Sequence, residues 1–138
     1  KIDTRAVIFN EENEILLVQE SDKNWSLPGG WADINESIAD NTAKEAFEES
    51  GLHVVPCRII AVHDRNRHNW PIYAYSICKF FIECSIVDGH FQENTETLCS
   101  NYFSLDNLPP LSNNKNTLEQ IKLCFTAHEN KNWLPVFD

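Results

Sequence analysis

The sequence predicts an α/β fold in which β-strands and two helices form layers around a hydrophobic core. Runs of β-branched and aromatic residues alternate with two segments of helical periodicity, which is typical of a layered α/β domain. The 42% of hydrophobic and 11% of aromatic residues are too many for a disordered chain. The length of 138 residues matches one domain, so we expect residues 1–138 to form a single domain.

The first half of the chain is expected to contain a β-hairpin followed by a helix. The apolar runs 5–9 and 15–18 flank the polar turn 10–13, a pattern typical of a hairpin. A Pro-Gly-Gly sequence at 28–30 then marks a tight backbone turn. Residues 37–49 are rich in Ala and Glu and predict a helix, which Gly51 is well placed to end.

The second half is expected to supply further strands and a second helix. Residues 54–62 predict a strand. Residues 72–87 are apolar on both faces, which predicts a long strand at the centre of a covered sheet. Residues 102–103 are a short strand candidate. The apolar residues of 117–128 have near-helical spacing and predict an amphipathic helix.

The charge and the cysteines exclude several classes of protein. With 11 basic and 21 acidic residues the net charge is −10, and such a field repels nucleic acids and anionic membranes. The longest aliphatic run is too short to span a bilayer, and no secretory signal is visible. The five cysteines include no Cys-x-x-Cys pair. We therefore expect a cytoplasmic protein with buried thiols, without a membrane partner or an extended nucleic-acid partner.

Three glutamates of the predicted helix 37–49 lie close together on its surface. Glu49 is about 40° from Glu45 around a helix, and Glu48 is about 60° away on the other side, so the three share an arc of roughly 100°. Such a face can be merely solvated, but the Pro-Gly-Gly turn before it and the Gly after it favour a metal site. Clustered carboxylates select Mg²⁺ or Mn²⁺, ions that neutralise and orient phosphates.

The segment from Gly30 to Leu52 resembles the sequence signature of the Nudix hydrolases. In that pattern a Gly is followed by five residues and a Glu, and then by seven residues and Arg-Glu-apolar-x-Glu-Glu-x-Gly-apolar. The one departure is Lys44, where the family has Arg. The resemblance implies the Nudix fold, a mixed β-sheet sandwiched between helices (α-β-α). Eight of the nine defining positions match, namely Gly30, Glu36, Glu45, Ala46, Glu48, Glu49, Gly51 and Leu52.

The resemblance also implies roles for these residues. Mg²⁺ or Mn²⁺ would be held by Glu45, Glu49, Glu48 and the Gly30 carbonyl. Glu45 and Glu48 would also take part in catalysis. Glu36 and Lys44 would support it as a pair that holds the loop against the helix. Because Lys lacks the two-point fork of Arg, we expect weakened order at the site. The implied activity is that of a pyrophosphohydrolase acting on a nucleoside diphosphate linked to another moiety.

A further glutamate is expected to act on the attacking water. In many Nudix enzymes this residue comes from a loop late in the sheet, and here the acidic loop 92–97 follows the predicted long strand. Glu96 is the first candidate for the base and Glu93 the second. The alternative is that Glu96 is only a solvated loop carboxylate. Many relatives carry this Glu nearer the aromatic pair 102–103, where the present sequence has Leu98 and Cys99.

Residues 63–70 form the only basic cluster along this acidic sequence. Arg65, Arg67 and His68 are therefore candidates for substrate binding, since Arg can hold phosphate oxygens at two points and His can stack on a base. The alternative is a hairpin loop whose charges face solvent.

Several stretches are most similar to the bacterial CDP-choline pyrophosphatase-like subgroup of Nudix enzymes, among them 3–9, 25–33 and 108–112. This similarity implies cleavage of CDP-choline to CMP and phosphocholine, and a helical segment upstream of Lys1. The alternatives are an ADP-ribose or nucleotide-sugar pyrophosphatase, a nucleotide sensor without catalysis, and an RNA-processing hydrolase, which the net charge disfavours. The expected partner is a small nucleotide, and a homodimer is compatible with the long apolar strand.

Overall fold

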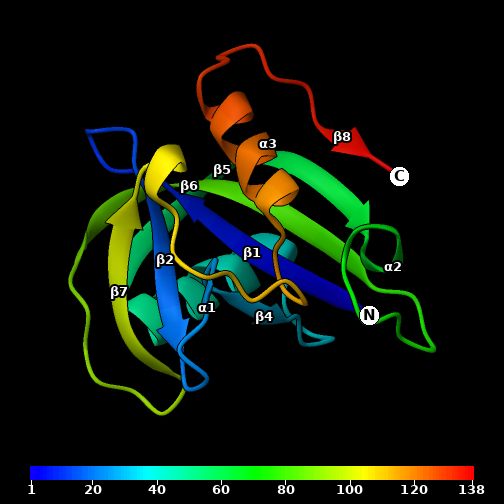
Figure 1. The fold of residues 1–138 in the computed structure, drawn as a ribbon, viewed down its shortest axis with the longest axis horizontal. Coiled ribbons are helices and arrows are strands. Elements are labelled where there is room, and N and C mark those ends of the chain that lie inside the picture. The colour runs from blue at the N-terminus through cyan, green and yellow to red at the C-terminus, as the bar shows by residue number, and fades with distance from the viewer.

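The computed structural model describes residues 1–138 as two β-sheets with helices packed around them (Figure 1). The larger sheet has the order β4-β1-β6-β5-β8 and the smaller one the order β3-β2-β7. The strands are β1 (Ile2–Ile8), β2 (Ile15–Glu20), β3 (Trp25–Ser26), β4 (Gly29–Trp31), β5 (Leu52–Asp64), β6 (Cys78–Gly89), β7 (Thr97–Phe103) and β8 (Val136–Phe137). The helices are α1 (Ile38–Ser50), α2 (Arg65–His68), α3 (Leu118–His128) and the 3-10 helix η1 (Leu105–Asn107).

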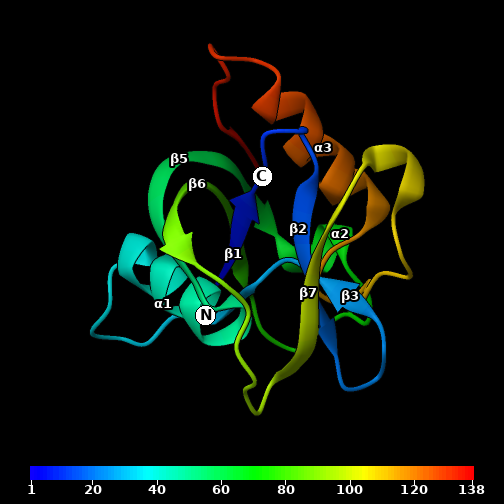
Figure 2. The same cartoon turned by 90° about the vertical axis from the view of Figure 1, so that its left-hand side faces the viewer.

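The larger sheet is mixed and is covered on both faces. Strand β1 runs parallel to β6 and antiparallel to β4. Figures 1 and 2 show α1 and α3 on opposite sides of this sheet. Ala6 and Ile8 belong to a buried cluster that includes Ala46 of α1, whereas Val7 belongs to a second cluster that includes Ile121 of α3. The predicted α/β fold with a mixed sheet between helices is confirmed.

The predicted hairpin of residues 5–18 is wrong. Strands β1 and β2 lie in different sheets, and the only bridge between these stretches joins Phe9 to Ile15. The physical reason is burial, because every residue of β1 from Asp3 to Ile8 is buried. A strand covered on both faces belongs inside a sheet, and β1 pairs there with β4 and β6.

The predicted strand 72–87 begins later than expected. Its central position is confirmed, since β6 lies between β1 and β5, but residues 72–77 form a loop. In this loop the amide and carbonyl of Tyr73 bond to the side chain of Asn66 instead of to a neighbouring strand. Strand β7 is longer than the predicted pair 102–103, and β3, β4, β8 and α2 were not predicted.

Both predicted helices are present, and each begins one residue after its predicted start, behind a capping side chain. The Ser37 side chain accepts a hydrogen bond from the Asp40 amide at 3.0 Å, which satisfies a free donor of the first turn of α1. Gly51 ends α1 at a φ of 75°, a left-handed conformation that favours glycine. At the start of α3, Thr117 and Gln120 form a reciprocal capping box.

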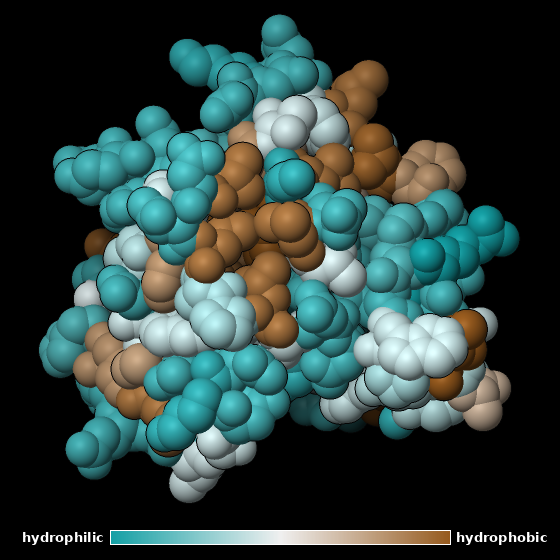
Figure 3. All heavy atoms as spheres, in the orientation of Figure 1, coloured by the Kyte–Doolittle hydropathy of each residue, from teal (hydrophilic) through white to brown (hydrophobic).

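The expectation that the cysteines are buried is only partly correct. Cys84 and Cys124 are buried, but Cys57 and Cys78 are exposed, and all five cysteines are free. None of the helices combines the length and the apolar character that a membrane-spanning segment needs. Figure 3 shows hydrophobic atoms gathered near the centre of the face that bears α3, with hydrophilic atoms around them.

Candidate functional site

Helix α1 directs two of its glutamates toward the turn that precedes it. Glu45 and Glu49 are one helical turn apart, so they point to the same side of the helix. Glu49 is buried, and its Oε2 accepts a hydrogen bond from the Gly29 amide at 2.9 Å. A Cβ atom on Gly30 would lie 3.1 Å from the carboxyl carbon of Glu45, so the Gly30 backbone closely approaches this carboxylate. Three of the four residues expected to hold a metal, Glu45, Glu49 and Gly30, therefore meet at the Pro-Gly-Gly turn.

A third glutamate joins this pair from the loop ahead of β7. One oxygen each of Glu45, Glu49 and Glu96 lies within 4.8 Å of the others. Asn94 shapes the loop by accepting hydrogen bonds from the amides of Glu96 and Thr97 at 2.9 and 2.8 Å. The Thr97 hydroxyl then donates to the Glu49 carbonyl at 2.7 Å, which ties the loop to the end of α1.

Glu48 and Glu93 lie outside this group of three carboxylates. Both side chains are exposed. On α1, Glu48 is turned away from Glu49 by about 100°, so burial of Glu49 against the Gly29 turn leaves Glu48 facing solvent. Glu48 still adds negative charge near Glu45.

Two of the three carboxylates, Glu45 and Glu49, have raised pKa values. Burial, together with the charges of Glu48 and Glu96, raises the pKa of Glu45 to about 7. Burial also raises the pKa of Glu49 to about 8, although Arg5 and the Gly29 amide stabilise its charge. A group of three carboxylates offers hard oxygen donors, which suit a divalent cation of the Mg²⁺ or Mn²⁺ type.

The predicted pairing of Glu36 with Lys44 is present. The Lys44 Nζ lies 2.8 Å from Glu36 Oε2 and 3.3 Å from Asp33 Oδ2. The contact joins the loop before α1 to the middle of the helix. Hydrogen bonding to Glu36 is the main cause that raises the pKa of Lys44.

A buried cluster of charges that was not expected from the sequence lies beside the carboxylates. Arg5 donates to both oxygens of Asp3, at 3.0 and 2.8 Å, and to the Leu27 carbonyl at 3.1 Å. Lys79 Nζ donates to Asp3 Oδ2 at 2.6 Å. The cluster thus carries two cations and one anion. Burial and the charge of Arg5 lower the pKa of Lys79 to about 7.

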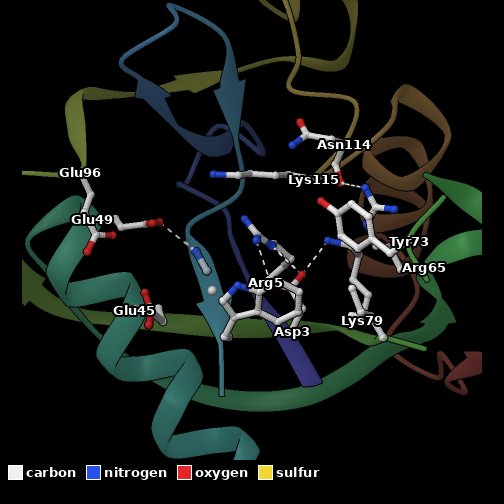
Figure 4. Close-up of a pocket in the computed structure, with 14 residues that line it drawn as sticks. Asp3, Arg5, Glu45, Glu49, Arg65, Tyr73, Lys79, Glu96, Asn114 and Lys115 are labelled. Carbon is white, nitrogen blue, oxygen red and sulfur yellow. Dashed lines mark hydrogen bonds and ion pairs between the residues drawn. The ribbon is translucent and has the colours of Figure 1, made fainter. Parts of the chain in front are cut away.

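These groups line one open cavity of about 410 Å³. Figure 4 shows Glu45, Glu49 and Glu96 on one side of it, Arg5 and Asp3 in the middle, and Tyr73, Arg65, Lys79 and Asn114 on the other side. Lys115, which forms an ion pair with Glu20, also lines it. A molecule with a metal-bound anionic end and further negative charge along its length would match this order of charges.

The predicted substrate-binding residues are separated by the fold. Arg65 is buried and lines the cavity. Arg67 and His68 do not line it. Arg67 points to solvent with only Asp64 nearby at 3.6 Å, and His68 Nε2 contacts Asp138 Oδ2 at 2.5 Å. The short helix α2 explains the separation, because it turns these three side chains in different directions.

The cations of the cavity come from positions that are far apart along the chain. Arg5, Arg65, Lys79 and Lys115 belong to four different segments, and only Arg65 lies in the basic cluster 63–70. The sequence did contain one signal for the buried charges. Asp3, Arg5 and Val7 lie on the same face of a predicted strand, and charged residues on a buried face need partners inside the protein.

The NUDIX domain family matches residues 1–124. The chain belongs to the Nudix family. This membership agrees with the resemblance found in the segment Gly30 to Leu52. The class of enzyme expected from that resemblance, a hydrolase of pyrophosphate bonds, is also the class for which related Nudix proteins are named.

Three such Nudix relatives cover nearly the whole chain. A Bacillus subtilis (strain 168) protein, provisionally named ADP-ribose pyrophosphatase YjhB, is 42% identical over all of this chain, which spans 66% of that protein. The crystal structure of an ADP-ribose pyrophosphatase from Streptococcus suis 89-1591 is 49% identical with a TM-score of 0.93, covering 100% of this chain and 98% of that one. The crystal structure of a UDP-X diphosphatase is 34% identical with a TM-score of 0.88, covering 98% and 66%.

Proposed function

We propose that this Nudix domain hydrolyses the diphosphate bond of a nucleoside diphosphate linked to another moiety, with Mg²⁺ or Mn²⁺ as cofactor. One observation carries the proposal. Three carboxylates converge within 4.8 Å on one side of a cavity whose middle holds Arg5. The carboxylates suit divalent cations and the positive charge of Arg5 suits phosphate oxygens, so this part of the cavity is complementary to a metal-bound diphosphate.

The residues of the chain divide this work between them. Glu45 and Glu49, with the Gly30 carbonyl, would hold the cation, which when bound neutralises the diphosphate and acidifies a water. Glu96 is the proposed base that orients the attacking water, because it faces Glu45 and Glu49 from a separate loop. Glu36 and Lys44 position the loop before α1, and the exposed Glu48 adds negative charge near the cation.

The substrate best supported is ADP-ribose. The proteins from B. subtilis and S. suis that share 42% and 49% identity are both named as ADP-ribose pyrophosphatases. A nucleotide sugar is the nearest alternative, since the 34% identical structure is named a UDP-X diphosphatase. CDP-choline, implied by the subgroup resemblance, is the third. A nucleotide sensor without catalysis is disfavoured because it would have little need for three convergent carboxylates.

The test is a product assay with purified protein. ADP-ribose, UDP-glucose and CDP-choline are each incubated with Mg²⁺, with Mn²⁺ and with excess EDTA, and the nucleoside monophosphate is quantified by chromatography. We expect AMP from ADP-ribose at the highest kcat/KM and no product with EDTA. If CMP forms from CDP-choline faster than AMP forms from ADP-ribose, CDP-choline becomes the proposed substrate and the proposed reaction still stands. No product from any of the three would overturn the proposed function.

A pair of variants assigns the activity to the carboxylate group. Glu49→Gln removes one buried carboxylate of the cluster and is expected to lower kcat by about 100-fold or more, with a much smaller effect on KM. Glu119→Gln is the matched control, because Glu119 is exposed on α3 and does not line the cavity. Near-normal turnover of the Glu49 variant would remove this residue from the catalytic machinery.

A further inference from the structure

The side of the cavity opposite the carboxylates is built around one buried guanidinium. Arg65 is 2% exposed, and its two terminal nitrogens donate to the backbone carbonyls of Pro71 and Asn114, the latter at 3.0 Å. Its guanidinium carbon also lies 3.8 Å from the centre of the Tyr73 ring. Because these contacts use its donors on backbone carbonyls, Arg65 fixes two loops in place and backs an aromatic ring.

Tyr73 is held firmly although it lies in a loop. The Asn66 side chain accepts a hydrogen bond from the Tyr73 amide at 2.9 Å and donates to the Tyr73 carbonyl at 3.0 Å. Asn69 of the same segment donates to the Asn113 carbonyl at 2.9 Å, which ties α2 to the loop that carries Asn114. The basic segment 65–69 thus acts as a scaffold that presents Tyr73 and Asn114 on the same side of the cavity.

The chemistry of this side suits a flat, electron-rich ring. Arg65 covers one face of the Tyr73 ring. Because Tyr73 also lines the cavity, a planar group in the cavity can stack on its ring. The side-chain amide of Asn114 makes no hydrogen bond within the protein and offers a donor and an acceptor. The positive charges of Arg65 and Lys79 disfavour a quaternary ammonium group at this place.

The other aromatic residue that lines the cavity is Trp31. It pairs with Asp3 across β4 and β1, and Lys1 Nζ lies 5.0 Å from its ring centre, whereas the buried Arg65 backs the Tyr73 ring. A nucleoside diphosphate whose reacting phosphates occupy the acidic side would extend its remote group past Arg5 toward Tyr73. The group that Tyr73 and Asn114 can recognise is the base, because a ribose has no π-face to stack.

We propose that Tyr73, backed by Arg65, is the platform on which the substrate's nucleobase stacks, and that Asn114 reads the edge of that base. An asparagine amide pairs at two points with the amino group and the ring nitrogen of adenine, so adenine is the expected base. This inference rests on the proposed function, of which it specifies the substrate class.

The experiment compares variants of one loop. Tyr73→Leu removes the ring and is expected to raise both the KM for ADP-ribose and the Kd for AMP about tenfold or more, with kcat little changed. Tyr73→Phe restores the ring and is expected to regain most of the affinity. Tyr75→Leu is the matched control, because Tyr75 is an exposed tyrosine of the same loop that does not line the cavity. The Kd for AMP is measured by calorimetry in EDTA.

A second comparison tests the reading of the base edge. The ratio of kcat/KM for ADP-ribose over inosine diphosphate ribose, whose hypoxanthine lacks the amino group, is expected to fall about tenfold in Asn114→Ala. An unchanged ratio would overturn the role of Asn114. Equal effects of Tyr73→Leu and Tyr75→Leu, or a loss in kcat without a rise in KM, would overturn the platform.

The two proposals fail in different ways. If no nucleoside diphosphate is hydrolysed, the proposed function fails, but weakened AMP binding by Tyr73→Leu would still support the platform. If ADP-ribose is hydrolysed and Tyr73→Leu binds AMP as tightly as the unaltered protein does, the reaction stands and the platform is overturned.

Discussion

Asp3 and Lys79 face each other across the parallel strands β1 and β6, and Lys79 Nζ donates to Asp3 Oδ2 at 2.6 Å. Both residues are buried, and Asp3 also pairs with Arg5. One carboxylate therefore compensates two buried cations at the centre of the candidate site. The two cations lower the pKa of Asp3 despite its burial, so it stays ionised.

Removing the charge of Asp3 should destabilise the protein strongly. Asp3→Asn leaves the buried Arg5 cation without its carboxylate partner, and we expect a loss of about 3–5 kcal/mol in the free energy of unfolding, measured by urea denaturation. Lys79→Met should lower the free energy of unfolding by less, because Asp3 still forms its ion pair with Arg5. Asp106→Asn, an exposed aspartate, is the control. Equal stability of the Asp3 and Asp106 variants would contradict the assigned charge balance.

Glu96 should matter more for activity than Glu48. Glu96 and Glu48 are both exposed, but only Glu96 belongs to the group of carboxylates whose oxygens lie within 4.8 Å of one another. We expect Glu96→Gln to lower kcat by about 100-fold and to reduce the increase in melting temperature caused by Mg²⁺, with weaker effects for Glu48→Gln. A larger loss in the Glu48 variant would return that residue to the centre of the site.

The pair of Lys44 and Glu36 should tune the order of the metal site. The pair is partly exposed, so its direct contribution to stability is small. Lys44→Ala releases the loop before α1 and is expected to weaken Mg²⁺ affinity about tenfold, while Lys44→Arg should strengthen it by adding a second contact point. Lys122→Ala on α3 is the control. Unchanged affinity and turnover in Lys44→Arg would show that the lysine does not loosen the site.

His63 should make stability depend on pH. Burial and the nearby His68 lower the pKa of His63 to about 4, below the ordinary value of 6.5. The unfolded chain therefore binds a proton more readily than the folded one. This stabilising contribution, up to about 3 kcal/mol, is present above pH 6.5 and is lost as pH falls toward 4.

The measurement is urea denaturation at pH 7 and pH 4.5. The difference in stability between these two pH values should be smaller in His63→Gln than in the unaltered protein. His90→Gln is the control, since His90 is exposed. The same pH dependence in all three proteins would show that His63 is not the responsible group.

Helix α1 shows how far the sequence could be followed. Its cap at Ser37, its end at Gly51 and the spacing of Glu45 and Glu49 are local properties, since residues a few positions apart determine them. The same holds for the helix that begins at Thr117. These features could be predicted because helical geometry converts spacing along the chain into spacing in space. The family followed from the resemblance of the segment Gly30 to Leu52 to the Nudix signature.

Pairing between distant strands decided the rest. The hairpin of residues 5–18 failed because β1 finds its partners in β4 and β6, and that choice follows from burial on both faces. Glu96 joins the carboxylates only because Thr97 bonds to the Glu49 carbonyl 48 residues away. The alternation of apolar and polar residues along a strand does not show which distant strand or loop it will contact.

The sequence by itself determined an acidic helix, the spacing of its glutamates and its family. Only the tertiary structure decided which cations face that helix. Arg5, Arg65, Lys79 and Lys115 share no local pattern, and they meet because the register of β1 with β6 and the contacts of α2 bring them to one cavity. Geometry within a helix follows directly from the local sequence, whereas long-range contacts depend on how the whole core packs.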